Sequence, residues 1–282
     1  MATLLHGDCL EIMKTLPDKS VDCFICDLPY GQLSKGYRSS GVHPQTTNVK
    51  QNKKGTEYGV ESCAWDIKID LPPFWEEVKR LAKDDHTPVL MFCNTKFGIE
   101  LINSNPSWFK YDLVWNKQRG VSFLLANKQP MKSHEMIYVF SKKTAYYKRI
   151  DEDSDRPGWE KEKRGRAGAV YGFDDGGKPA SGVAGKRCCL SVINLKKPAS
   201  WQLKSTHPTE KPLDLYTWLL ERYCPPGGTV LDPTAGSFNA IKAAVALGLN
   251  AIGIEKDDGF FKKAESHFAV TDVSDNTIHL VD

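Results

Sequence analysis

The sequence predicts an α/β fold with a doubly wound, mainly parallel sheet. Short apolar runs rich in β-forming residues alternate with amphipathic stretches along the chain, and residues 229–254 have the pattern of a βαβ unit. The 282 residues suffice for one large domain with an insertion, or for two small domains. We predict one domain made of two halves, 1–141 and 205–282, with an insertion at 142–204.

In the first half, helices and strands follow one another as far as residue 141. Asp8 can cap a helix, and Pro72 and Pro73 fall in the first turn of another, where proline is tolerated. The sheet is expected to be mainly parallel, with an antiparallel addition late in this half. The predicted helices are Cys9–Thr15, Leu71–Ala82 and Thr95–Asn103, and the predicted strands are Val21–Cys26, Pro88–Cys93, Lys110–Trp115 and Glu135–Phe140.

The second half contains the βαβ unit and the helices on either side of it. Pro225-Pro226-Gly227-Gly228 predicts the turn before its first strand, and Pro233–Ser237 predicts the loop after that strand. The predicted helices are Leu213–Tyr223, Asn239–Leu247 and Gly259–Phe268, and the predicted strands are Thr229–Asp232 and Ala251–Ile254.

Two segments lack periodicity and carry positive charge. Residues 31–64 are polar and include five Lys and Arg residues, and so long a loop is usually a lid or binding segment. Residues 156–204 contain eleven Lys and Arg residues against four acidic ones, in a chain whose net charge is only +3. Such a local excess is expected for a polyanion-binding segment, and charge alone fits a solvated loop about as well.

The remaining composition is that of an ordinary globular protein. No apolar run approaches the ~20 residues that span a bilayer, and the N-terminus lacks signal-peptide features. The eight cysteines are therefore expected to stay reduced in a cytoplasmic compartment. Cys23 and Cys26 lie in a predicted strand and should face opposite ways, so we expect structural thiols and no metal site.

The βαβ unit predicts a site for an adenosyl ligand. Glu255 follows Gly236 by 19 residues, near the spacing expected for a carboxylate that accepts ribose hydroxyls. Of the three glycines in a dinucleotide fingerprint, this loop has only Gly236. The backbone is therefore poorly suited to bind a pyrophosphate. S-adenosylmethionine, which has ribose but no phosphate, fits better, and Asp232 at the strand end can accept from its ammonium group.

The strand at 21–26 ends in Asp27-Leu28-Pro29-Tyr30, which alone is more typical of a proline turn. Beside a methyl donor it becomes a pocket for an exocyclic amine. The Asp27 carboxylate and the Leu28 carbonyl each accept one N–H and so localise the lone pair on nitrogen. The Tyr30 ring offers a stacking face worth about 1–3 kcal/mol per base. Because parallel strands end at one edge of a sheet, Asp27 and Asp232 are expected near each other.

Four motifs in their order resemble the amino-methylating DNA methyltransferases (adenine-N6 and cytosine-N4) of the beta arrangement. The resemblance covers most of 4–141 and 205–268. It implies the S-adenosylmethionine-dependent methyltransferase fold with a circularly permuted motif order, and a target-recognition insertion at 142–204. The motifs are Gly7-Asp8 with the following helix, Asp27-Leu28-Pro29-Tyr30 as D-P-P-Y, His207–Pro212, and Asp232–Ser237 as D-P-F-A-G-S.

The resemblance also implies roles for individual residues. Leu28 replaces the usual proline, but its backbone carbonyl survives the change, and Phe238 replaces a common glycine in the loop. The implied catalytic residues are Asp27, Leu28, Pro29 and Tyr30. The implied cofactor-binding residues are Asp8, Cys9, Asp27, Thr209, Lys211, Asp232, Thr234, Ala235, Gly236, Ser237, Phe238, Glu255 and Lys256. The implied DNA-binding residues are Lys35, Arg38, Lys161, Lys163, Arg164 and Arg166.

The implied activity is methylation of the N6 of an adenine flipped out of double-stranded DNA, because an acidic first motif residue, rather than serine, points to adenine. Cytosine-N4 is the nearest alternative, followed by a non-catalytic DNA-binding protein on the same fold and by a protein or RNA methyltransferase. Cytosine carbon-5 chemistry is disfavoured, since it needs a Pro-Cys nucleophile and this chain has Cys224-Pro225. A homodimer, a companion restriction nuclease and a bacterial or phage-infected host cell are compatible with the resemblance.

Overall fold

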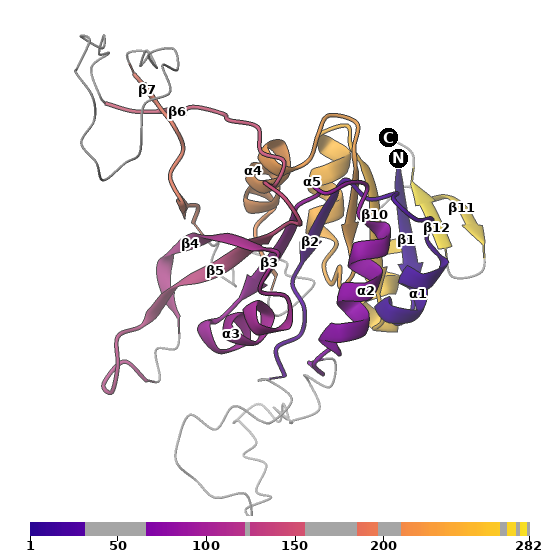
Figure 1. Cartoon of the computed structure of the whole chain (residues 1–282). Helices are drawn as coiled ribbons and strands as arrows, with labels where there is room; N and C mark the ends of the chain where they lie inside the picture. The colour runs from indigo at the N-terminus through magenta and orange to yellow at the C-terminus, as the bar shows by residue number, and fades with distance from the viewer. Residues whose placement is uncertain are drawn as a thin grey trace, which may run out of the picture. The chain divides into compact units, whose positions relative to one another are not determined.

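Among the residues that the structure describes, ten strands form one sheet (Figure 1). The structure is a computed structural model that describes residues 1–31, 66–121, 125–155, 185–196, 210–265, 270–274 and 277–280. Two compact units divide the chain: Met1–Tyr147 together with Ser191–Asp282, and Lys148–Leu190. The sheet belongs to the first unit.

The centre of the sheet is parallel and joins the two ends of the chain. Its strands lie in the order β1, β10, β9, β2, β3, and every neighbouring pair is parallel. They are β1 (Ala2–His6), β10 (Asn250–Glu255), β9 (Thr229–Asp232), β2 (Cys23–Cys26) and β3 (Val89–Cys93). Strands from the last fifth of the sequence therefore separate β1 from β2.

Both edges of the sheet are extended by antiparallel strands. Beyond β3 lie β5 (Lys132–Phe140), antiparallel to β3, and β4 (Phe109–Val121), antiparallel to β5, followed by β8 (Val192–Asn194). Beyond β1 lies a hairpin of β12 (Thr277–Leu280) and β11 (Val270–Ser274). The late antiparallel addition predicted from the sequence is confirmed by β5 and β4.

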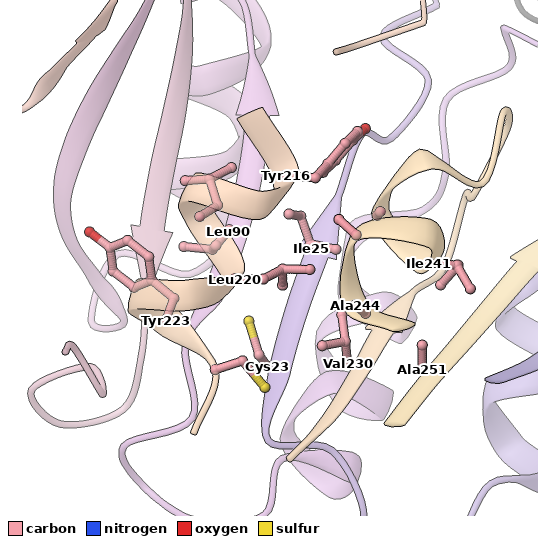
Figure 2. Packing of buried hydrophobic residues seen from close by; sticks show 14 of the residues in the cluster. Cys23, Ile25, Leu90, Tyr216, Leu220, Tyr223, Val230, Ile241, Ala244 and Ala251 are labelled. Atoms are coloured by element: carbon pink, nitrogen blue, oxygen red, sulfur yellow. The ribbon is translucent and has the colours of Figure 1, made fainter. Parts of the chain in front are cut away.

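Helices cover both faces of the sheet. α4 (Leu213–Tyr223) and α5 (Asn239–Ala246) pack on one face, where Figure 2 shows their apolar side chains against those of the strands beneath. α1 (Cys9–Thr15), α2 (Leu71–Leu81) and α3 (Thr95–Ser104) pack on the other face.

The residues of β2 show how one strand serves both faces. Cys23 and Ile25 belong to the apolar cluster under α4 and α5, whereas Phe24 and Cys26 belong to the cluster under α1 to α3. Side chains alternate because successive residues of a strand point to opposite sides. This confirms the doubly wound α/β prediction and the prediction that Cys23 and Cys26 face opposite ways.

Most predicted elements agree with the structure within a few residues, but six of the described strands were not predicted. These are β1, β8, β11 and β12, together with β6 (Glu152–Asp153) and β7 (Lys186–Arg187), and all fall in stretches that the sequence left without regular structure. β4 runs to Val121, well past the predicted end at Trp115. The last helix, α6, spans Asp258–Glu265, and the remainder of its predicted range lies outside the described residues.

The described residues of the second unit contain a short antiparallel pair, β6 (Glu152–Asp153) with β7 (Lys186–Arg187). Lys186 forms an ion pair with Asp153 at 2.5 Å. Across all the parts of the chain that the structure describes, no helix is both long enough and apolar enough to cross a membrane.

Candidate active site

Three carboxylates lie at the carboxyl ends of three neighbouring parallel strands. Asp27 follows β2, Asp232 ends β9, and Glu255 ends β10. In the register of the sheet, Phe24 pairs with Leu231, and Asp232 pairs with Gly253. The expectation that Asp27 and Asp232 share one edge is therefore met by adjacent strands. The chain winds away from β9 and β2 in opposite directions, and such a reversal point is where open α/β sheets bind ligands.

Asp27 is held by two donors. Tyr30 donates its hydroxyl to Asp27 Oδ1 at 3.1 Å, and the ammonium group of Lys211 contacts Asp27 Oδ2 in a short ion pair. The side chain of Lys211 is only 4% exposed, and its Nζ lies 4.4 Å from the centre of the Phe92 ring. Lys211 comes from the segment just before α4, so this contact joins the two halves of the domain.

Glu135 at the start of β5 completes a buried charge cluster around Asp27. Its Oε2 pairs with Lys117 at 2.9 Å, while its Oε1 lies 3.2 Å from the Tyr30 hydroxyl and 3.8 Å from Lys211 Nζ. The sequence did not single out Glu135 or Lys117. β5 is antiparallel to β3, so its first residues, and not its last, lie at the edge where β2 and β3 end.

The charges in this cluster compensate one another. Burial raises the pKa of the Glu135 carboxyl, but the ammonium groups of Lys211 and Lys117 outweigh it and hold that pKa at about 2. Burial lowers the pKa of Lys211, and the Asp27 and Glu135 carboxylates more than offset this and raise it. Burial first, and then the Asp27 and Glu135 charges, raise the pKa of Tyr30. Tyr30 therefore stays a neutral donor between two anions.

The end of β9 and the loop after it carry a buried carboxyl and a buried hydroxyl. Asp232 is 3% exposed and accepts the Thr234 backbone N–H at 3.0 Å. Burial raises the pKa of Asp232 to about 8. The Thr234 hydroxyl is buried and finds no hydrogen-bond partner in the described parts of the chain. A buried carboxyl beside an unsatisfied hydroxyl suits a ligand that brings an ammonium or hydroxyl group.

Glu255 is tied to the same loop. Its Oε2 accepts the Gly236 N–H at 2.8 Å and its Oε1 the Asp257 N–H at 2.8 Å. Each carboxylate oxygen can accept more than one hydrogen bond, so both remain able to accept from ribose hydroxyls. Burial raises the pKa of Glu255, and these backbone donors partly oppose that shift.

Asp8 lies next to Glu255 because the Gly7 N–H donates to the Glu255 carbonyl at 3.0 Å. Asp8 Oδ1 caps α1 through the Leu10 N–H at 3.0 Å, and Asp8 Oδ2 pairs with Lys256 at 3.0 Å. Cys9 is buried, and burial raises the pKa of its thiol to about 12, so the thiol stays protonated at neutral pH.

Phe238, at the start of α5, adopts a backbone conformation that usually requires glycine. Its φ of 58° and ψ of 21° are left-handed, a conformation that non-glycine residues rarely adopt. Its ring is fully buried and lies so near β10 that a Cβ on Gly253 would come within 3.0 Å of it. The Phe238 ring therefore packs in the core, and its cofactor-binding role stays a prediction.

The remaining predicted site residues are placed as follows. The Leu28 side chain is buried, and the Tyr30 ring packs on Phe97 with 5.0 Å between centroids. Ala235 anchors the loop through its N–H to the Ile254 carbonyl at 2.8 Å. Sequence reasoning also missed Asn239, which donates to the Lys211 carbonyl at 2.9 Å. Seven predicted residues lie outside the described residues: Lys35, Arg38, Lys161, Lys163, Arg164, Arg166 and Thr209.

The fold and these strand ends define a doubly wound α/β protein with a candidate ligand site at the carboxyl edge of its sheet. A family model described as DNA methylase, for N6 and N4 methyltransferases, matches residues 21–266. The chain belongs to this DNA methylase family, and it is a DNA methyltransferase of the N6/N4 type.

Relatives and solved structures agree with this assignment. The chain is 25% identical to the type II methyltransferase M.HinfI of Haemophilus influenzae, over 99% of this chain and 71% of the relative. It is 26% identical to the DNA adenine methyltransferase YhdJ of Escherichia coli, over 92% and 80% respectively.

Among solved structures, the M1.HpyAVI–SAM complex matches with a TM-score of 0.55 at 18% identity, covering 94% of this chain and 98% of that one. The cytosine-N4-specific PvuII DNA methyltransferase matches with a TM-score of 0.57 at 13% identity, covering 97% and 88%. At these identities the structures establish the fold, which is the predicted methyltransferase fold.

Proposed function

We propose that this protein transfers a methyl group from S-adenosylmethionine to the exocyclic N6 of an adenine flipped out of double-stranded DNA. The observation that carries the proposal is the position of Asp27-Leu28-Pro29-Tyr30 at the end of β2, directly beside the Asp232 loop at the end of β9. A pocket for an amine and a pocket for an adenosyl ligand then share one edge of the sheet.

The cofactor side uses the carboxylates of β9 and β10. S-adenosylmethionine supplies an electrophilic methyl group on its sulfonium sulfur. Asp232 accepts from the ligand's ammonium group, the buried Thr234 hydroxyl gains a partner, and Glu255 accepts from the ribose hydroxyls. Asp8 and Lys256 lie at the rim, where Lys256 is 74% exposed and Asp8 is 42% exposed.

The acceptor side orients the amine. Asp27 and the Leu28 carbonyl each accept one N–H of the target amino group, which localises the nitrogen lone pair toward the methyl donor. Alignment of this kind supplies much of the rate, since oriented attack is worth ~7–11 kcal/mol. Tyr30 stacks on the extruded base, and extrusion itself costs a few kcal/mol. No covalent enzyme intermediate is needed.

Adenine is favoured over cytosine by the acidic first residue of the motif. YhdJ is named an adenine methyltransferase, which supports adenine as the target. The PvuII enzyme is named cytosine-N4-specific, so cytosine-N4 is the alternative target. The basic residues of 31–64 and 156–204 are proposed to grip the duplex. A homodimer and a companion restriction nuclease stay predictions from the resemblance, and a cytoplasmic location stays a prediction from the sequence.

The test is methyl transfer from tritium-labelled S-adenosylmethionine to unmethylated DNA, followed by base analysis of the product by mass spectrometry. We expect N6-methyladenine from the wild-type protein and no transfer from Asp27→Ala. Asp85→Ala is the matched control, because Asp85 also pairs with lysines, Lys142 and Lys143, but at a distant surface position.

Each outcome separates the candidate functions. Detection of N4-methylcytosine in the product would show that the target base is cytosine and not adenine. DNA binding without transfer by the wild-type protein would point to a non-catalytic DNA-binding protein. Transfer to protein or RNA alone would overturn DNA as the substrate.

A further inference from the structure

Each oxygen of the Asp27 carboxylate already has one donor in the structure. Oδ1 accepts the Tyr30 hydroxyl and Oδ2 contacts Lys211. The proposed function requires Asp27 to accept an N–H from the target amine, so one donor has to leave or share its oxygen. Lys211 is almost fully buried, and its only other anion in this cluster lies at 3.8 Å, which makes Lys211 the harder donor to move.

The Tyr30 hydroxyl can leave without any movement of heavy atoms. Its oxygen is 3.1 Å from Asp27 Oδ1 and 3.2 Å from Glu135 Oε1. A tyrosine hydroxyl has a single proton, so it donates to one of these carboxylates at a time. Rotation about the C–O bond transfers the hydrogen bond from Asp27 to Glu135.

We propose that Glu135 is a positioning residue that takes over the Tyr30 hydroxyl when the target amine reaches Asp27. The exchange leaves Oδ1 free to accept the amine N–H, while Lys211 keeps Oδ2 fixed. The proposal rests on the proposed function and adds to it a residue that does not touch the substrate.

The carboxylate of Glu135 is buried and held in one orientation. Its side chain is 14% exposed, and Lys117 at 2.9 Å holds the other oxygen, so Oε1 is kept facing Tyr30. The neighbouring lysines keep the carboxylate ionised, and an ionised acceptor forms a stronger hydrogen bond than a neutral one. A glutamine at this position would lack the charge. Its carbonyl oxygen would be a weaker acceptor for the Tyr30 hydroxyl than a carboxylate oxygen, and its NH2 group could not accept at all.

The experiment is a double-mutant cycle of Glu135→Gln and Tyr30→Phe, measured as single-turnover methyl transfer at saturating cofactor and DNA. Glu135→Gln is expected to lower the rate about 10- to 100-fold, the effect of one hydrogen bond to a charged group. In the Tyr30→Phe background Oδ1 has no hydroxyl to release. The Glu135→Gln loss is then expected to shrink to about twofold or less.

A purely structural role for Glu135 would give a different pattern. If the mutation acts by leaving Lys211 bound more tightly to Asp27, or by loosening the fold, the loss is equal in both backgrounds, and the proposal is overturned. It is overturned equally by an unchanged rate in Glu135→Gln. Binding of S-adenosylmethionine, measured by calorimetry, should change little in either variant.

Two further variants complete the design. Glu77→Gln is the matched control, since Glu77 is 16% exposed and pairs with Arg80 on α2, and its rate should equal that of the wild type. If Glu135→Gln fails to fold, Glu135→Asp replaces it, because the shorter side chain keeps the charge but withdraws the acceptor from Tyr30. A wild-type protein that transfers no methyl group to DNA would instead refute the proposed function.

Discussion

At the scale of single residues, the unusual group is the buried carboxyl of Asp232. Burial raises its pKa from 3.8 in the unfolded chain to about 8 in the folded protein. Between these values the folded protein holds a proton that the unfolded chain has released. Stability therefore falls as the pH rises from about 4 to about 8. A charged ligand group beside Asp232 removes this penalty when the cofactor binds.

Asp232→Asn tests this reasoning. The amide keeps the hydrogen bond from Thr234 but cannot ionise, so the variant should be more stable than the wild type at pH 8, by a few kcal/mol, and nearly equal at pH 4. Urea unfolding at both pH values measures the difference. The same variant should bind S-adenosylmethionine more weakly in calorimetry. Parallel pH profiles for the two proteins would contradict the role given to Asp232.

At the scale of elements, the contact between β10 and α5 sets the position of the ligand loop. A Cβ on Gly253 would lie 2.8 Å from Ile241 and 3.0 Å from the Phe238 ring, so the helix packs where only glycine leaves room. Both contacts lie next to the loop that joins β9 to α5. Tight packing here therefore controls where Thr234 and Gly236 present their polar groups.

Gly253→Ala should thus lower the free energy of unfolding by about 1–3 kcal/mol, the usual range for overpacking a core. It should also reduce the thermal stabilisation produced by S-adenosylmethionine, because α5 has to shift. Thermal melts with and without cofactor measure both effects. Gly259→Ala is the control, since its added methyl would meet only the Asp257 carboxylate, at 3.1 Å. An unchanged melting temperature in Gly253→Ala would show that α5 moves freely.

The elements also show how far the sequence could predict the structure. β2, β9 and β10 were predictable because each is an apolar run that ends in a turn or an acidic residue. β1 and β8 have five and three residues, and they depend on partners far along the chain. The same dependence on distant partners distinguishes the site residues that could be predicted from the one that could not. Asp27, Asp232 and Glu255 lie at the carboxyl ends of parallel strands. Glu135 lies in the first half of the antiparallel strand β5, and only the pairing of β3 with β5 brings it to the site.

At the scale of the whole molecule, charge is distributed unevenly along a nearly neutral chain. Replacing Lys161, Lys163, Arg164 and Arg166 by serine should weaken DNA binding and make its dependence on salt shallower. Each lost phosphate contact lowers the slope of log K against log[salt] by about 0.9. Fluorescence anisotropy at several salt concentrations measures the slope, and cofactor binding should not change.

A control set with equal charge loss is available on the first unit. Lys14, Lys142, Lys143 and Lys262 are all more than half exposed and form surface ion pairs, and their replacement should leave the slope nearly unchanged. If both sets changed the salt slope equally, the 156–204 segment would add only general positive charge and no specific DNA contacts.

The placement of β1 and β2 has a consequence for the synthesis of the protein. β1 is flanked by β10 and β12, and β2 by β9 and β3, so β1 waits for both of its partners, and β2 for one of its two, until residues 229–280 are translated. Asp27 likewise waits for Lys211, and the proposed cofactor site cannot form before Glu255 has been translated. Until then β1 lacks both neighbouring strands and β2 lacks β9, so apolar strand surface stays uncovered. A chain that stops before residue 255 should therefore fail to bind S-adenosylmethionine.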